Sequence, residues 1–473
     1  MTKKIMATIL TAITISGMVG CSPDVEASAS GVLQTPEINF SNYETNEKFI
    51  SFVDLPPDPY RSLDDYKGLG FSGFILTEDY LLLTQNGAMT GSYKDAVRRL
   101  NDNGLGVYVR NQYNDPYYFD TTAEGSAEYE RNYTLDSRSL TDEFRENGGV
   151  AGFYMADEPT FNKISAFDPL IDWYNANYAD SYFHMNLFPS YVGQAGLNGH
   201  TYEQYVQEYV DKIASKVKGR KSVCLDNYPF NRNDSIRASY LSDLLIAATK
   251  TKAYNDTAKA ADKANMGLCI QTFYDGGLVD IRGSSDVSFQ LLCGMAMGAR
   301  TFEYFCYRSY IDGAIQLHGI FDSNMQKRVY DYVKEANEKY LGFEKVVNAF
   351  EWQGVNTLYA SDETKIENEE AFSAISGLVL GNTGKLNLGG CRSKLDTLIG
   401  AFKKGDDYGY MVVNYSLPSA GKSNVVELAF NNATHAAVYS ATENGVQSSV
   451  VTLADGKARI TLGAGDGVFV IPV

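Results

Sequence analysis

The chain has 473 residues, of which 44% are hydrophobic and 21% charged, a composition typical of a globular protein of two or three domains, or of one large barrel with an appendage. Its formal net charge of −17 argues against a nucleic-acid partner and against a basic membrane-binding patch. An uncharged or cationic ligand suits this charge better than a polyanion does.

The N-terminal residues predict a targeting segment. Lys3 and Lys4 precede an apolar stretch at residues 5–19, which has the length of a signal peptide and is short for a membrane-spanning helix. The stretch ends with the sequence MVGC at residues 18–21, which resembles a bacterial lipobox, and the resemblance implies lipidation of Cys21.

We therefore expect a lipoprotein signal peptide at residues 1–20 and a polar tether at residues 21–46. The lipid anchor would hold the protein at the cell membrane or cell surface, on the extracytoplasmic side. An ordinary secreted signal peptide followed by an incidental cysteine is the alternative.

Residues 47–350 repeat one pattern, in which an apolar stretch ends in polar or aromatic residues and a helical stretch follows. Eight such repeats predict a (β/α)8 TIM barrel, in the α/β class. A doubly wound sheet is the alternative, but no glycine-rich phosphate-binding sequence follows the first strand. The predicted strands are residues 48–54, 73–78, 105–111, 149–158, 181–187, 222–226, 267–273 and 300–307.

The repeated strand–helix pattern of the sequence ends after residue 350. Residues 351–395 form a mixed segment that we interpret as a connection. Residues 396–473 contain short alternating strands separated by turn residues, including Asp455-Gly456. This pattern predicts a small C-terminal all-β sandwich.

Histidine and cysteine show no metal-ligand spacing. The four histidines are scattered, and the five cysteines after Cys21 are odd in number and lie mostly in apolar runs, as small buried hydrophobes do. We expect no metal, no cofactor and no disulfide framework.

The fourth predicted strand ends in two acids and a proline. Residues 149–156 are mostly apolar and run directly into Asp157, Glu158 and Pro159. Proline cannot continue a central strand, and the carboxyl ends of barrel strands are where barrel enzymes hold their catalytic residues. The alternative is that Asp157 caps a helix that Glu158 and Pro159 open.

A secreted barrel, a carboxylate pair after its fourth strand and a C-terminal β-sandwich together resemble retaining glycoside hydrolases of the large (β/α)8 clan. In that clan an Asn-Glu pair ends the fourth strand and its Glu is the general acid/base, while a Glu ending the seventh strand is the nucleophile. The resemblance implies that Glu158 is the acid/base and that Asp157 accepts hydrogen bonds from sugar hydroxyls. Repulsion from Asp157 would raise the pKa of Glu158, as a proton donor requires.

The seventh strand departs from this pattern, because Gln271 stands where the nucleophile should be. Gln271 could bind a hydroxyl group, so the second acid must come from elsewhere or be absent. Asp226 at the end of the sixth strand ranks first, Glu303 in the eighth strand second, and Asp275 is more typical of a turn. The alternative is that Asp226 caps a loop and that Glu303 pairs with an arginine, Arg300 or Arg308.

Further substrate-binding candidates share a position at the carboxyl end of a predicted strand. The polar ones are Asp54, Glu78, Asn111, His184 and Asn186, and the aromatic ones, which could stack on sugar rings, are Tyr228, Phe273 and Tyr307.

Two functions follow. The first is a lipid-anchored glycoside hydrolase that cleaves oligo- or polysaccharide by paired-carboxylate catalysis. The second is a catalytically inactive, carbohydrate-binding surface lipoprotein, which Gln271 favours. A barrel lyase or a metal-dependent hydrolase is a third reading, and the scattered histidines argue against its metal version.

Overall fold

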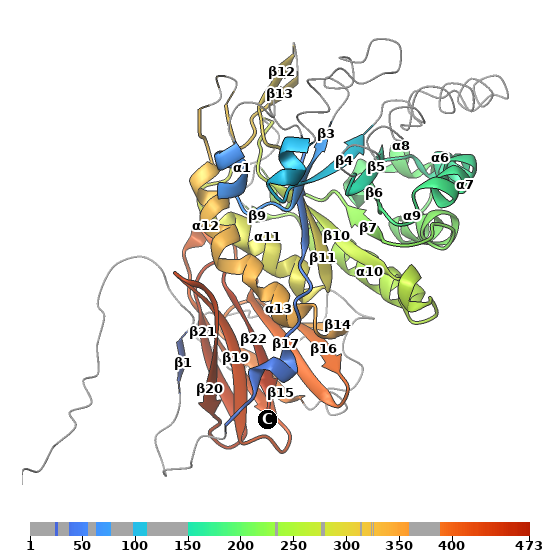
Figure 1. The fold of residues 1–473 in the computed structure, drawn as a ribbon. Coiled ribbons are helices and arrows are strands. Elements are labelled where there is room, and N and C mark those ends of the chain that lie inside the picture. The colour runs from blue at the N-terminus through green and yellow to red at the C-terminus, as the bar shows by residue number, and fades with distance from the viewer. Residues whose placement is uncertain are drawn as a thin grey trace, which may run out of the picture.

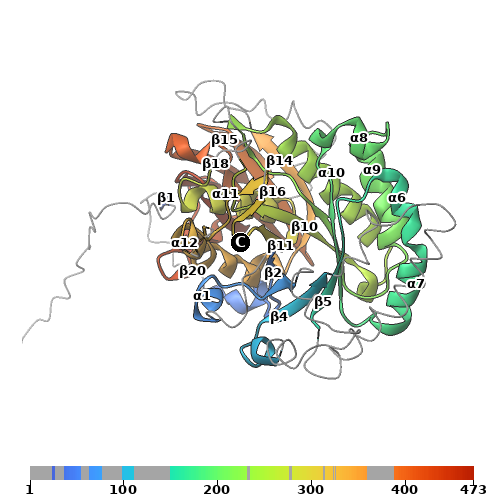
Figure 2. The same cartoon turned by 90° about the horizontal axis from the view of Figure 1, so that it is seen from above.

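The computed structural model describes residues 24–26, 37–54, 63–76, 98–110, 150–231, 235–275, 280–312, 315–322, 324, 326–358 and 388–473. Its centre is a closed barrel of parallel strands, seen from the side in Figure 1 and from above in Figure 2, and this confirms the predicted (β/α)8 barrel. In chain order the strands are β2 (Ile50–Val53), β3 (Gly73–Leu76), β4 (Gly106–Arg110), β5 (Gly152–Asp157), β6 (Tyr182–Leu187), β7 (Lys221–Leu225), β10 (Ala264–Gln271) and β11 (Ala299–Phe305).

Alternation along each strand divides the barrel into an outer and an inner layer. In β5, Phe153 and Met155 join the large core beneath the helices, whereas Tyr154 faces inward. Aromatic rings fill much of the interior, which is therefore packed like other barrel cores and is not a pore. The inner cluster consists of Ile50, Phe52, Ile75, Tyr108, Tyr154 and Tyr182.

Helices surround the barrel. The α-helices are α1 (Leu63–Gly68), α6 (Phe161–Ile164), α7 (Asp168–Asn177), α8 (Gln194–Leu197), α9 (Tyr202–Tyr209), α10 (Ala238–Asn255), α11 (Ser284–Ala296), α12 (Tyr330–Tyr340) and α13 (Glu344–Val347). Short 3-10 or π turns are η1 (Phe40–Tyr43), η5 (Ser165–Phe167), η6 (Ser190–Val192), η7 (Val210–Ala214), η8 (Ala260–Asp262), η9 (Leu341–Phe343) and η11 (Pro418–Ala420). Helix α9 begins with a capping box, in which Thr201 and Gln204 each bind the other's backbone amide.

Two antiparallel sheets form the predicted sandwich and enclose a second core. One sheet has the order β1 (Asp24–Glu26), β21 (Lys457–Leu462), β18 (Asn424–Phe430) and β15 (Leu388–Ser393). The other has the order β14 (Glu351–Leu358), β16 (Thr397–Lys404), β17 (Asp407–Asn414), β22 (Gly467–Pro472), β19 (His435–Thr442) and β20 (Gly445–Thr452). Two hairpins, β8 (Phe230–Asn231) with β9 (Ser235–Ile236) and β12 (Tyr310–Asp312) with β13 (Ile315–Leu317), lie outside these sheets.

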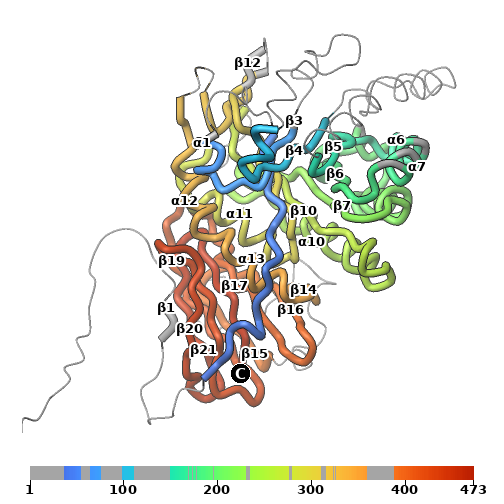
Figure 3. The backbone as a smooth tube through the Cα atoms, viewed as in Figure 1, coloured from blue at the N-terminus to red at the C-terminus, as the bar shows by residue number. Residues whose placement is uncertain are grey.

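Sheet pairing extends the sandwich beyond its predicted range. Strand β14 pairs with β16 and β15 pairs with β18, so both ends of the segment interpreted as a connection are sandwich strands. Part of the expected tether also contacts the sandwich, since the Phe40 ring meets Tyr439 edge-on and Lys404 donates to the Asn42 carbonyl. Figure 3 shows this N-terminal run crossing the sandwich before it enters the barrel.

Barrel and sandwich share one continuous core, with α11 lying between them in Figure 1. The approach is closest at Gly400 of β16, where a Cβ atom would stand 2.1 Å from the Ala296 carbonyl oxygen of α11. Trp352 Nε1 donates to that same oxygen at 2.9 Å. Only glycine fits at position 400 without moving the helix away from the sheet.

The expected signal peptide and Cys21 lie outside the described residues. Among the helices that are described, none is both long enough and apolar enough to cross a lipid bilayer.

Candidate functional site

Glu158 and Asp226 lie at the same level of the barrel mouth. The Glu158 amide donates to the Asn186 carbonyl and the Asp226 amide to the Leu187 carbonyl, each at 3.0 Å. The two acids therefore follow β5 and β7, on either side of β6. Two strand spacings of ~4.8 Å separate their backbones by about 10 Å.

Glu158 adopts an uncommon backbone conformation. Its φ angle is +48°, in the left-handed region that non-glycine residues seldom occupy. Such conformations cost of order 1–3 kcal/mol and cluster at functional sites. Asp157 is the last residue of β5, and helix α6 starts only after its N-cap residue Thr160. The alternative in which Asp157 caps a helix is therefore wrong.

The electrostatic environment keeps protons on this pair. Burial, followed by the charges of Asp226 and Asp157, raises the pKa of Glu158 to about 9. Burial and the charge of Asp157 raise the pKa of Asp226 to about 8, while the Tyr228 hydroxyl opposes the rise. Because each ionisation makes the other harder, the protons leave in two steps, and the intermediate state has one acid and one carboxylate.

The remaining hydrogen-bonding capacity of Asp226 points to a ligand position. Its Oδ1 atom is buried and has no hydrogen-bond partner in the described part of the chain. The Oδ1 atom of Asn186 is also buried and has no hydrogen-bond partner among the described residues. Two buried acceptors at one barrel mouth could each take a hydrogen bond from a substrate hydroxyl or a water molecule.

Arg110 was not identified from the sequence, yet it links two predicted residues. Its Nη1 atom lies 3.3 Å from Oδ2 of Asp54, and its Nη2 atom lies 3.2 Å from Oδ2 of Asp157. Tyr154 donates to the other Asp157 oxygen at 2.7 Å, and Asn186 donates to the Tyr154 hydroxyl at 3.1 Å. Asp157 is thus held by an ion pair with Arg110 and a hydrogen bond from Tyr154.

Glu303 lies deeper in the barrel than the other acids and pairs with His184. The Glu303 Oε2 atom is 2.8 Å from His184 Nε2, and His184 Nδ1 is 2.7 Å from the Ser222 hydroxyl. Burial lowers the pKa of His184 to about 3, and burial together with the charges of Asp54, Asp157 and Asp226 raises that of Glu303. Both shifts favour the uncharged forms of the imidazole and the carboxyl group.

His184, Glu303 and Cys224 also offer the one His/Cys/Asp/Glu cluster with metal-ligand geometry among the described residues. Their ligand atoms lie within 4.8 Å of one another. A metal-bound cysteine must be deprotonated, whereas burial raises the pKa of the Cys224 thiol well above its ordinary value. We interpret the cluster as a hydrogen-bonded part of the barrel interior.

Three aromatic residues predicted to stack on sugar rings are packed into the protein. Tyr228 meets the Phe273 ring edge-on at 4.8 Å, and Phe273 meets Phe305 in the same way. Tyr307 stacks on Tyr66 and on Phe321 and is only 2% exposed. These rings shape the wall of the site and leave little surface for a ligand.

Gln271, which replaces the clan's nucleophile, takes part in the fold around the site. Its side chain accepts from the Phe230 amide and donates to the Phe273 carbonyl, both at 3.3 Å. Asp275 is exposed just beyond β10. Two other predicted residues, Glu78 and Asn111, lie outside the described residues.

Tyr191 is an aromatic residue near the acid pair that the sequence did not single out. It lies in η6, its side chain is 42% exposed, and the Arg237 guanidinium stands 4.0 Å from its ring centroid. Partial burial, then the charges of Asp226 and Glu158 raise its pKa, which places the hydroxyl within electrostatic reach of both acids. An exposed ring beside an acid pair suits contact with a sugar face.

Comparison with known proteins shows a resemblance of architecture. No protein-family model matches the chain, and no curated protein sequence matches it. An endoxylanase of glycoside hydrolase family 30 from Clostridium papyrosolvens C71 has 9% identity and a TM-score of 0.42, over 91% of this chain and 97% of that chain. An alpha-L-arabinofuranosidase of family 51 from Thermotoga petrophila RKU-1 has 9% identity and a TM-score of 0.42, over 92% and 98%.

A third solved structure, the catalytic module of a family 98 glycoside hydrolase from Streptococcus pneumoniae TIGR4, has 8% identity and a TM-score of 0.39, over 92% of this chain and 100% of that chain. At such identities and TM-scores these matches decide neither family nor activity, so the function has to be argued from the site itself.

Proposed function

We propose that the protein is a glycoside hydrolase in which Glu158 and Asp226 form the catalytic pair. The observation that carries the proposal is that the two acids follow β5 and β7 at the same level of the barrel mouth, where each has a raised pKa and the charge of Asp226 acts on Glu158. Cleavage of a glycosidic bond needs one carboxyl group that donates a proton and one carboxylate that attacks the sugar or activates water. The singly protonated state of this pair provides both.

Glu158 is the proton donor in this scheme. Burial and the charges of Asp226 and Asp157 raise its pKa to about 9, as a proton donor requires. The Tyr228 hydroxyl favours the ionised form of Asp226, which fits the role of nucleophile or base. Asp226 supplies the second carboxyl group, which Gln271 at the clan's nucleophile position lacks.

Asp157 binds substrate rather than transferring protons. Arg110 and Tyr154 hold its side chain in place at the edge of the mouth, where it can accept hydrogen bonds from sugar hydroxyls. Asp54 stabilises this arrangement because its carboxylate forms an ion pair with Nη1 of the same Arg110 side chain. Lipidation at Cys21 would keep this site at the cell membrane or surface, on the extracytoplasmic side.

The proposal is tested with a panel of chromogenic glycosides and with Glu158→Gln, Asp226→Asn and the double variant. Each single variant is expected to lose about 10²–10⁴-fold in kcat. The double variant is expected to be scarcely worse than either, because residues that act as one unit are strongly non-additive. Glu203→Gln, an exposed glutamate paired with Lys250, is the matched control and should keep full activity.

A protein that hydrolyses no glycoside in the panel and still binds a glycan on an array would support the inactive carbohydrate-binding alternative. Hydrolysis that stays within a few-fold of wild type in Glu158→Gln would remove Glu158 from the role of acid. For an active enzyme, NMR of the first anomer released distinguishes retention from inversion, which follows from the separation of the two carboxyl groups.

A further inference from the structure

A cavity of about 490 Å³ lies at the end of the barrel opposite to Glu158. Its lining includes residues at the amino ends of barrel strands, among them Ile50, the first residue of β2, Lys221, the first of β7, and Asn265, the second of β10. Because the strands are parallel, their amino ends meet at one face, and Glu158 follows the carboxyl end of β5. The cavity is therefore separate from the candidate active site.

Positive charge dominates the lining of this cavity, although the chain as a whole carries a net charge of −17. Glu47 is the one acidic residue in the lining. The five cationic residues are Lys48, Arg220, Lys221, Lys263 and Arg300.

Two of these cations are already neutralised. Lys48 Nζ lies 2.5 Å from a Glu344 oxygen, and Lys263 Nζ lies 3.0 Å from a Glu351 oxygen. Within the described ranges of the chain, the other three cations form no ion pair, although the charges of Glu47 and Glu351 act on Arg300 and that of Asp262 acts on Lys221. They are Arg220, Lys221 and Arg300.

The environment of Lys221 is unusual for an ammonium group. The residue is 1% exposed, its Nζ donates to the Val217 carbonyl at 2.5 Å, and the Tyr254 ring centroid is 5.4 Å away. Burial lowers its pKa to about 8, and Asp262 opposes the change. A buried cation without a paired anion is unfavourable, and an anion in the adjoining cavity would offset that cost.

The two arginines supply directional donors. Arg220 is exposed, with its guanidinium 5.6 Å from the Tyr182 ring centroid. Arg300 is partly buried and donates one hydrogen bond to the Phe350 carbonyl at 2.8 Å, which leaves further N–H groups for a ligand. Planar guanidinium groups match the oxygen geometry of phosphate-type anions.

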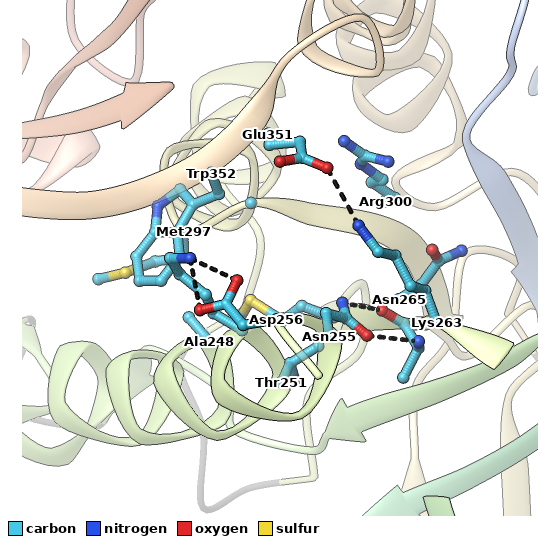
Figure 4. Close-up of a pocket in the computed structure, with 14 residues that line it drawn as sticks. Ala248, Thr251, Asn255, Asp256, Lys263, Asn265, Met297, Arg300, Glu351 and Trp352 are labelled. Atoms are coloured by element: carbon cyan, nitrogen blue, oxygen red, sulfur yellow. Dashed lines mark hydrogen bonds and ion pairs between the residues drawn. The ribbon is translucent and has the colours of Figure 1, made fainter. Parts of the chain in front are cut away.

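A smaller adjoining cavity, of about 110 Å³, shares Lys263, Asn265 and Arg300 with the first. Figure 4 shows Arg300 beside the Lys263–Glu351 ion pair at this shared edge. The ion pair joins Lys263, which directly precedes β10, to Glu351 of β14 at this edge of the larger cavity.

We propose that the cavity at the amino end of the barrel binds a small oxyanion, with inorganic phosphate or a phosphomonoester as occupant. Arg220 and Arg300 donate hydrogen bonds to its oxygens, and Lys221 provides a buried positive charge. The site is independent of the proposed glycosidase activity, since it lies at the other end of the barrel.

Isothermal titration of the full chain tests this proposal, with sodium phosphate and glycerol 3-phosphate as separate ligands and sodium chloride keeping the ionic strength constant. We expect saturable binding at one site per chain, with a dissociation constant below ~10 mM. Tighter binding of glycerol 3-phosphate identifies a phosphomonoester as occupant, and tighter binding of phosphate identifies the free ion.

Arg220→Gln and Arg300→Gln are each expected to weaken binding by about tenfold, as loss of a charge-assisted hydrogen bond does. Arg459→Gln, which changes an exposed arginine of the sandwich strand β21, should bind like wild type. Arg220 is exposed, so its variant reports on binding even if Arg300→Gln does not fold. Absence of saturable heat in wild type, or unchanged binding in Arg220→Gln, would overturn the proposal.

Discussion

Arg110 and Asp157 meet through a 3.2 Å contact at the edge of the barrel mouth, and the same guanidinium also reaches Asp54. This cation balances two carboxylates, one of which, Asp157, raises the pKa of Glu158. Replacement by methionine should leave Asp157 and Asp54 uncompensated, so that more negative charge surrounds Glu158 and its pKa rises further.

For Arg110→Met we therefore expect the pH profile of kcat/KM to move toward higher pH and the rate to fall by about 10–100-fold, since preorganised electrostatics of this kind contribute a few kcal/mol. Arg110→Lys keeps the charge without the two-armed geometry and should recover the pH profile more than the rate. A pH profile of Arg110→Met that matches wild type would show that Arg110 acts only in folding.

Glu303 is expected to support the site without taking part in proton transfer. In Glu303→Gln the side chain can still donate to His184 Nε2, and the raised pKa of the carboxyl group that it replaces favours the uncharged form. Activity should stay within about threefold of wild type, in contrast to the loss predicted for Glu158→Gln. Glu303→Ala should lower the free energy of unfolding by ~2–4 kcal/mol, because it leaves a cavity and an unpaired imidazole. Loss of activity in Glu303→Gln comparable to Glu158→Gln would identify Glu303 as catalytic.

Stability should fall as the pH rises from about 5 to about 9. The folded pKa values of Glu158 and Asp226 lie above their unfolded values, so the native state binds more protons than the unfolded state in this window. Their contribution is complete below the unfolded pKa values and is lost as pH passes through the folded ones. We expect a decrease of ~2 kcal/mol or more in the free energy of unfolding, measured with urea at each pH.

The double variant Glu158→Gln/Asp226→Asn cannot ionise at these positions and should lose less stability over the same pH range. An equal pH dependence in wild type and double variant would contradict the raised pKa values.

The left-handed backbone conformation at Glu158 predicts that glycine is more stable than alanine at this position. At φ +48° glycine carries no Cβ penalty, so Glu158→Gly should be more stable than Glu158→Ala by about 1 kcal/mol. Both variants lack the carboxyl group and should be equally inactive. Equal urea midpoints for the two variants would show that the backbone relaxes when the glutamate is removed.

Apolar runs predicted the eight barrel strands because a buried parallel strand needs apolar residues on both faces, a requirement that is visible in the sequence. Such runs also located Asp157, Glu158 and Asp226, since each follows directly on the end of one. The C-terminal sandwich was recognised by its alternating strands, but β14 and β15 were missed because they lie in a segment of mixed composition.

Side-chain partners were harder to predict, because they depend on how the barrel closes. Glu303 pairs with His184, which is 119 positions away in the sequence, and not with either arginine near it in the chain. Arg110 carries no local pattern beyond being a single cation at the end of an apolar strand. Tyr307 follows a strand end as predicted, but nothing in the sequence shows that Tyr66 and Phe321 stack on its ring.

The shared core around Gly400 also limits how this architecture can change. Separate expression of the two domains, divided between Phe350 and Glu351, would expose apolar surface on both. Neither barrel nor sandwich is therefore expected to be stable when fused to another protein in place of that protein's own domain. Because one core spans both, barrel and sandwich are expected to move as a single rigid body.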